Sequence, residues 1–401
     1  MTIANYEIVL ANSSNSYFAG QAVAGNVIVE VQEKPKLIHG IKLKLQGKAK
    51  THWKEATSNR GATTHYTDEE AYIQEKVYLF GYDDNSDGNT HTLPTGKHIY
   101  PFSFILPESL PSSLTHKHGQ VKYYLEATIS RGQGITKPNY TCRLPFTVNA
   151  ILDLNNEFGA LHEAQISKEK NVCCFCCKSG PVGFDFKIFK SGFVPGEVVK
   201  FHADLFNHST REVSTLLDLV QDLKFHAMGR TKTKSVQIIT LEGPKLKPSE
   251  TKEWKSDFDT TMGYDSVLRI PAVPPSRLDG CRIIEVTYYL KVKMDVKDAV
   301  TLKDYIPITV GTIPLREDFA ELGGGELAGS QVEINVESDL TTVLLVPNYP
   351  DLPPPTYEEA ITLSYSEPLE DDDLPPEYMA AVKFIPKYVT YSPRSAHVQQ
   401  K

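Results

Sequence analysis

The chain has 401 residues and a formal net charge of −8, and 40% of its residues are hydrophobic. This length suggests two or three domains of roughly 100–200 residues each, with enough apolar residues for real cores. The sequence has no apolar run long enough to span a bilayer and no start typical of a signal peptide, so we expect a cytosolic protein with free thiols.

The charge is distributed unevenly along the chain. Residues 311–401 contain 5 Lys or Arg and 16 Asp or Glu, a local charge of −11, whereas the preceding body is close to neutral. Nucleic-acid binding usually needs a concentrated basic patch, so we expect no nucleic-acid partner. The acidic segment 315–401, which is rich in proline and weak in apolar patterning, is predicted to be a disordered tail.

The first half of the body shows the alternation of apolar and polar residues that is typical of β-strands. It runs through segments 27–31, 41–45 and 121–129. Clusters of Gly, Pro, Asn and Asp separate such segments, as expected for short antiparallel strands. Residues 1–150 are therefore predicted to form an antiparallel β-sandwich.

The second half repeats the pattern of the first. The sequence VKYYLEA at 121–127 returns as VTYYLKV at 286–292, which is 165 residues later. An apolar run that ends in proline precedes each copy, and a glycine-led strand opens each half at Gly20 and Gly196. Three matches in the same order indicate a duplicated domain.

One segment of the second half is ambiguous. The apolar residues from Val213 to Leu223 fit the spacing of an amphipathic helix. The repeat instead aligns Leu217 with Leu43 of a predicted strand, so we predict a strand here. The fold class is thus all-β with two tandem sandwiches. The predicted divisions are a first sandwich at 1–150, a linker at 151–171, a second sandwich at 172–314 and the tail at 315–401.

The tail carries the sequence Pro-Pro-x-Tyr twice. Proline favours the polyproline II helix, whose repeat of about three residues projects the first proline and the tyrosine from one side. Aromatic-lined grooves of WW domains recognise segments of this kind. A spacer of 17 residues would let a partner with several WW domains bind both copies at once. The residues predicted to bind WW domains are Pro354, Pro355, Tyr357, Pro375, Pro376 and Tyr378.

Four cysteines are crowded near the start of the second sandwich. They are too close together to wrap one zinc ion, whose ligands usually come in spaced pairs, so no metal site is predicted. Reversible S-palmitoylation is the functional interpretation, and a cysteine-rich start of the first strand is the structural one, which we favour. The candidates for lipidation are Cys173, Cys174, Cys176 and Cys177.

Four lysines alternate along one predicted strand of the first half. They could face phosphate groups on a partner or anionic lipid. A solvated strand face gives the same pattern, and we favour that interpretation. The candidates for anion contact are Lys42, Lys44, Lys48 and Lys50.

The remaining reactive residues point to no chemistry. His116 and His118 have no nearby carboxylate or cysteine to complete a metal set. Cys281 is followed by Arg282, which is weak support for a reactive thiol. The sequence contains no nucleophile elbow, no phosphate-binding glycine loop and no His-Glu-x-x-His helix, so we expect neither enzymatic activity nor a cofactor.

Taken in order, these features resemble the arrestin-domain-containing proteins, or α-arrestins. The match rests on the glycine-led strand 20–31, the stretch 93–106, the cysteine-rich opening of the second domain, segment 192–197 after it, and the paired Pro-Pro-x-Tyr motifs. The resemblance implies two arrestin-like sandwiches and an adaptor. Such an adaptor binds membrane receptors or transporters and brings WW-domain ubiquitin ligases of the HECT type to them, promoting ubiquitylation, endocytosis and endosomal sorting.

The resemblance also carries expectations about place and partners. It implies a membrane-peripheral protein of the cytoplasm that is recruited to the plasma membrane and endosomes. Some relatives bind thioredoxin through a cysteine of the second domain, but we do not expect this of Cys281. The alternative function is a cargo-sorting scaffold similar to retromer's arrestin-like subunit, which would act without a ubiquitin ligase.

Overall fold

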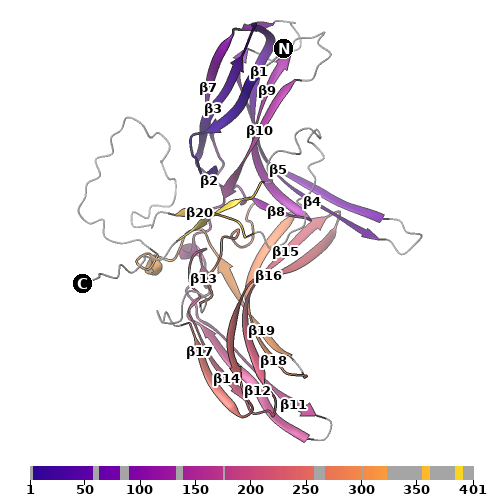
Figure 1. Cartoon of the computed structure of the whole chain (residues 1–401), viewed down its shortest axis with the longest axis vertical. Coiled ribbons are helices and arrows are strands. Elements are labelled where there is room, and N and C mark those ends of the chain that lie inside the picture. Colours follow the sequence, from indigo (N-terminus) through magenta and orange to yellow (C-terminus); the bar gives the residue numbers. More distant parts are fainter. Residues whose placement is uncertain are drawn as a thin grey trace, which may run out of the picture.

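Two elongated β-sandwiches lie end to end, and two short tail strands lie beside the narrow region where they meet (Figure 1). This computed structural model describes residues 3–56, 63–81, 90–131, 139–174, 177–256, 267–299, 301–322, 355–361 and 384–391. Apart from short 3₁₀ turns, the regular elements in these ranges are all strands, which confirms the predicted all-β class. None of the described residues form a helix long and apolar enough to span a membrane.

The first sandwich consists of a three-stranded and a seven-stranded sheet. The smaller has the order β1-β3-β7, and the larger runs β2-β10-β9-β4-β5 with β6 beside β4 and β8 beside β9. Most pairs are antiparallel, but β2 runs parallel to β10. The strands are β1 (Ile3–Leu10), β2 (Ser16–Phe18), β3 (Ala22–Val31), β4 (Lys36–Ala56), β5 (Thr63–Gly81), β6 (His91–Leu93), β7 (Gly96–Ile105), β8 (Leu114–His116), β9 (Gly119–Arg131) and β10 (Tyr140–Asn149).

The second sandwich has the same plan with four and five strands. Its sheets have the orders β11-β12-β14-β17 and β13-β19-β18-β15-β16, and β13 runs parallel to β19 as β2 does to β10. The strands are β11 (Ala164–Cys174), β12 (Cys177–Ile188), β13 (Gly192–Phe193), β14 (Phe201–Asn207), β15 (Val213–Ala227), β16 (Arg230–Leu246), β17 (Glu250–Lys255), β18 (Ile284–Val296) and β19 (Thr301–Val310).

The two copies of the repeated sequence occupy equivalent strands, β9 and β18. In each copy the first tyrosine is buried and donates a hydrogen bond to the carbonyl of a proline upstream. Tyr123 bonds Pro111 and Tyr288 bonds Pro274, both with an Oη–O distance of 2.7 Å. The duplication predicted from the sequence therefore extends to individual hydrogen bonds.

The ambiguous segment of the second half is strand, as predicted. It forms β15, which lies beside β18 as β4 lies beside β9. Leu217 and Leu219 are fully buried, like Leu43 and Leu45 in β4. Long central strands with one buried face thus form the core of each sandwich.

The second sandwich begins earlier than the sequence suggested. Strand β11 starts at Ala164 and pairs along its length with β12, so residues 164–171 of the expected linker belong to a sheet. Most residues of β11 are exposed, and the strand lies at the edge of its sheet. An edge strand of this kind carries little hydrophobic signal.

The sandwiches meet at a seam formed by the tips of β4, β5 and the β8–β9 turn against the second domain. The Thr51 hydroxyl donates to the carbonyl of His226 at 2.8 Å. Arg282 and Glu70 form an ion pair across the seam, with 2.6 Å between Nε and Oε1. A Cβ added to Gly119 would come within 2.5 Å of the Phe225 ring, so a side chain as small as glycine's is needed here. The relative placement of the two domains is thus held by specific contacts.

Candidate docking segment in the tail

The first Pro-Pro-x-Tyr motif lies partly in an ordered strand of the tail. Thr356 and Tyr357 belong to β20 (Thr356–Glu359), which pairs antiparallel with β21 (Lys387–Thr390). Tyr357 lies opposite Val389, and the Thr356 and Thr390 hydroxyls are 2.8 Å apart. We refer to β20 and β21 together as the tail strand pair. Three segments of the tail expected to be disordered are therefore ordered here, namely 315–322, with a 3₁₀ turn at Arg316–Asp318, 355–361 and 384–391.

Strand β21 is attached to the first sandwich through its backbone. The carbonyl of Lys387 accepts hydrogen bonds from Ser16 Oγ at 3.0 Å and from Asn149 Nδ2 at 3.3 Å. The Lys387 amide donates to Thr147 Oγ1 at 3.0 Å. The next side chain continues this contact, since the buried Tyr388 hydroxyl donates to the carbonyl of Ser113 at 2.8 Å.

Tyr391, directly after β21, is attached to the second sandwich. The Tyr391 amide donates to the carbonyl of Pro195 at 2.9 Å, and its hydroxyl donates to the carbonyl of Thr312 at 2.8 Å. Tyr391 is 1% exposed, and this burial raises the pKa of its phenol. Strand β21 together with Tyr391 thus connects both domains beside the seam (Figure 1).

The Tyr357 ring packs on a small apolar cluster that takes residues from both domains, the linker and the tail. This burial raises the pKa of the Tyr357 phenol. We call this group the waist cluster. Its buried members are Phe18, Leu152, Leu154, Ala160, Val194, Leu315, Leu322, Val389 and Tyr391. Tyr357 is half-buried against them, so this side chain, which the sequence predicts to bind WW domains, packs against residues of its own chain.

The second motif and part of the first lie outside the described residues. Pro355 is described and half-buried, whereas Pro354 is not described. Pro375, Pro376 and Tyr378 fall in the chain between β20 and β21, beyond the described ranges. Their role in binding WW domains stays a prediction.

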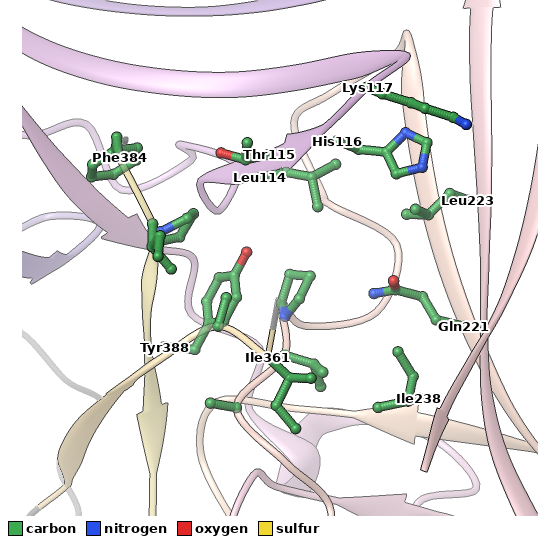
Figure 2. A pocket seen from close by; sticks show the side chains of 16 residues that line it. Leu114, Thr115, His116, Lys117, Gln221, Leu223, Ile238, Ile361, Phe384 and Tyr388 are labelled. Carbon is green, nitrogen blue, oxygen red and sulfur yellow. The ribbon is translucent and has the colours of Figure 1, made fainter. Parts of the chain in front are cut away.

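A pocket lies next to the tail strand pair, between the two domains. Figure 2 shows Leu114 and His116 of the first domain, Leu223 and Ile238 of the second, and Tyr388 of the tail around it. The tail forms one wall, and the Ile361 amide donates to the carbonyl of Ala272 there at 3.3 Å. Most of the lining is apolar, so the pocket favours packing rather than chemistry.

The four lysines proposed for anion contact lie on one face of β4, as their spacing predicted, and all are half-exposed. Neighbouring strands supply carboxylates. Lys48 Nζ lies 3.0 Å from Glu69 of β5, and Lys44 Nζ lies 3.9 Å from Glu126 of β9. Lys42 and Lys50 also have partners. Part of the positive charge is therefore compensated, and anion contact by this face stays a prediction.

The cysteine cluster lies where β11 turns into β12. Cys174 is paired with Cys177 across this hairpin, and Cys173 with Lys178. Cys176 falls outside the described residues, as do the side chains of the other three. The cluster thus forms the end of an edge hairpin rather than the start of the first strand, and its acylation stays a prediction.

The histidine pair belongs to the seam. His116 is 2% exposed, stacks on Phe225 of the second domain at 4.8 Å between ring centroids, and accepts a hydrogen bond at Nδ1 from the His118 amide at 3.1 Å. Burial, with His118 and two lysines nearby, lowers the pKa of His116 to about 3. In the described part of the chain, no three His, Cys, Asp or Glu side chains are grouped to hold a metal. The sequence did not reveal this packing role, because Phe225 is distant along the chain.

Cys281 is half-buried near Tyr72 at the seam. Burial raises the pKa of its thiol. Arg282, the residue that gave weak support for a reactive thiol, pairs instead with Glu70. A thiolate at Cys281 is therefore disfavoured.

Comparison with known proteins agrees with this architecture. Residues 6–155 match the N-terminal domain of arrestin (or S-antigen), and residues 178–315 match its C-terminal domain. Arrestin domain-containing protein 17 of Caenorhabditis elegans is 30% identical over 348 residues, covering 82% of this chain and 77% of that protein.

Further relatives come from mammals. Arrestin domain-containing protein 4 of Mus musculus is 30% identical, covering 85% of this chain and 78% of that protein. Thioredoxin-interacting protein of Sus scrofa is 27% identical over 381 residues, covering 92% of this chain and 89% of that protein. With both arrestin domains matched in order and relatives of this similarity, the chain belongs to the arrestin domain-containing proteins, the α-arrestin family of arrestin-like adaptors.

Proposed function

We propose that this α-arrestin is a non-enzymatic adaptor that recruits WW-domain ubiquitin ligases of the HECT type to membrane cargo. The body would bind receptors or transporters, and the tail would bind the ligase through its two Pro-Pro-x-Tyr motifs. Catalysis is then supplied by the partner, and this chain contributes proximity and orientation. The expected results are cargo ubiquitylation, endocytosis and endosomal sorting, by a cytoplasmic protein recruited to the plasma membrane and endosomes.

The observation that carries this proposal is the combination of a two-domain arrestin body with a tail that holds paired motifs. The body has the architecture of a family of adaptors. The tail supplies Tyr357 and Tyr378, each three positions after a proline that begins a Pro-Pro pair. Such segments suit aromatic-lined grooves because little backbone entropy is lost on binding.

Thioredoxin is not part of the proposal. One of the more distant relatives is named as a thioredoxin-interacting protein. In this chain, however, the candidate thiol of Cys281 is half-buried and its pKa is raised. A nucleophilic thiolate would need the opposite environment.

The test is isothermal titration of the full chain with a tandem WW fragment of a HECT-type ligase. We expect Tyr357→Ala and Tyr378→Ala each to weaken binding, and the double variant to abolish it. Tyr349→Ala is the matched control, because the segment that ends in Tyr349 lacks the first proline of the motif. If the double variant binds as well as the parent, the motifs are incidental and the ligase-independent sorting scaffold becomes the better explanation.

A further inference from the structure

We propose that the tail strand pair is an intramolecular latch that masks the first Pro-Pro-x-Tyr motif from WW domains. In the latched state Tyr357 is bound by its own chain, and a WW domain gains access only when β20 separates from β21 and from the waist cluster. The inference rests on the proposed function and adds a control step to it. It makes the availability of the motif a property of the folded body.

The two bound states of Tyr357 exclude one another. A WW groove binds the motif as a polyproline II helix, with its backbone free of a sheet and its tyrosine in the groove. In this structure Thr356 and Tyr357 are paired in register with Thr390 and Val389. The Tyr357 ring packs on the waist cluster. A WW domain therefore competes with the tail strand pair for the same side chain and backbone.

The latch has a built receptor site rather than a chance contact. In β21, three of the four residues are buried, and so is Tyr391 directly after it. Backbone and hydroxyl groups of Lys387, Tyr388 and Tyr391 make hydrogen bonds to both domains. These bonds satisfy polar groups that burial would otherwise leave unpaired, which makes the docked position specific.

The half of the latch that carries the motif is held less firmly. Strand β20 has four residues, and Thr356, Glu358 and Glu359 are exposed. A pair of two strands is marginally stable unless it packs on other structure, and the ring of Tyr357 is the main packing contact that β20 makes with the waist cluster. We therefore infer that β20 opens more readily than β21 detaches. Masking raises the apparent dissociation constant by the inverse of the open fraction.

Gly196 allows the latch to be opened from the body without touching the motif. This residue has φ +94°, and a Cβ added to it would overlap the carbonyl oxygen of Tyr391. Gly196→Ala should therefore push the end of β21 away. Because any L-residue is strained at this φ, a control must carry the same strain without the clash. Gly229, with φ +71° and no heavy atom within 4 Å of an added Cβ, provides it.

The experiment measures binding of a single WW domain from a HECT-type ligase, by titration. Every protein carries Tyr378→Ala, so that only the first motif can respond. The probes are the parent chain, Gly196→Ala, Gly229→Ala, a chain ending at residue 383 that lacks β21, and a synthetic peptide of residues 350–361. Hydrogen exchange of segment 387–391 reports directly whether β21 remains docked.

The proposal predicts that the peptide binds at least about tenfold more tightly than the parent chain. Gly196→Ala and the shortened chain should both bind within about threefold of the peptide, with exchange protection at 387–391 lost in Gly196→Ala. Gly229→Ala should behave as the parent does. Should Gly196→Ala fail to fold, the shortened chain decides the question alone.

Two other outcomes distinguish a failure of the latch proposal from a failure of the proposed function. If the peptide binds and the parent chain binds equally well, masking is refuted while ligase recruitment stands. If the peptide itself does not bind, the first motif is no WW ligand, and both the recruitment role of this motif and its masking are overturned.

Discussion

The hydroxyl of Tyr391 donates a hydrogen bond to the carbonyl of Thr312, with 2.8 Å between the oxygens. Thr312 follows the last strand of the second sandwich, and its own hydroxyl is hydrogen-bonded to the backbone where the chain passes from the first domain to the second. Thr312 Oγ1 donates to the carbonyl of Ala150 at 2.9 Å and accepts from the Leu152 amide at 2.7 Å. Linker, second domain and tail therefore meet at one buried residue, 3% exposed.

Replacing Thr312 by valine should lower the free energy of unfolding by about 1–3 kcal/mol, because it leaves the Ala150 carbonyl and the Leu152 amide buried without their partner. Urea denaturation measures this. Thr301→Val is the control, since Thr301 is exposed and bonds a carboxylate near solvent, and it should change stability by less than about 0.5 kcal/mol. Equal effects at the two positions would contradict the bridging role of Thr312.

Removing the hydroxyl group from each of the two equivalent tyrosines of the repeat should lower the free energy of unfolding by different amounts. Tyr123 Oη donates to one carbonyl, whereas Tyr288 Oη donates to Pro274 and also accepts from Gln221 Nε2 at 2.7 Å. Tyr123→Phe should lower the free energy of unfolding by about 1 kcal/mol. Tyr288→Phe should lower it by about 2 kcal/mol or more, because the Pro274 carbonyl and the Gln221 amide both lose their partner. Chemical denaturation of the two variants, compared at the transition of the affected domain, checks the order. A larger loss for Tyr123→Phe would show that the interpretation is wrong.

Acidification should weaken the seam through His116. Burial, followed by His118 and two lysines, lowers the pKa of His116 in the folded chain to about 3, while the unfolded value is about 6.5. Between these values the unfolded chain binds the extra proton, so stability rises with pH and is lost as pH falls below about 6.5. The loss approaches about 1.4 kcal/mol for each pH unit within this window.

The melting temperature as a function of pH measures that dependence. His116→Phe keeps a ring against Phe225 but cannot take up a proton, so its curve should be flatter below about 6.5. His162→Phe, the same substitution at an exposed histidine, is the matched control. Parallel curves for the parent and His116→Phe would exclude this histidine as the source.

Cys281 should react slowly with thiol reagents in the folded chain. Burial raises the pKa of Cys281, and it raises the pKa of Cys142 to about 12, so both are protonated near neutral pH. A variant in which the four cluster cysteines are serine leaves only these two thiols. Alkylation by iodoacetamide, followed by mass spectrometry, should be much slower in the folded than in the urea-unfolded variant. Rapid labelling of native Cys281 would bring thioredoxin back as a candidate partner.

Much of the fold could be predicted from the sequence because each sandwich repeats the same period-two pattern. The buried face of β9 and the aligned tyrosine pair in β18 indicated the duplication and settled β15 as a strand. Strand β11 was missed because an exposed edge strand, with polar residues on both faces, leaves no such alternation. Its pairing with β12 depends on backbone hydrogen bonds that every residue can make.

The site could be predicted only in part. Side chains alternate between the two faces of a strand, which was enough to predict that the β4 lysines share one face. The carboxylates beside them come from neighbouring strands, whose register the sequence does not give. The run from Tyr388 to Tyr391 is β-branched and aromatic, which is a signal for a strand, yet it is short and lies in an acidic tail. Its docking surface is assembled from residues far away along the chain, such as Ser16 and Thr312.

Because β21 and Tyr391 directly after it make hydrogen bonds to both sandwiches, this segment acts as a splint across the seam. Thermodynamic linkage then works in both directions. If the proposed function and the latch both hold, a cargo that binds better when the two sandwiches are free to change their mutual angle would raise the affinity for the ligase. The ligase would then raise the affinity for that cargo by the same factor. Under the latch proposal, an adaptor of this design would recruit its enzyme most strongly when it already holds something to be ubiquitylated.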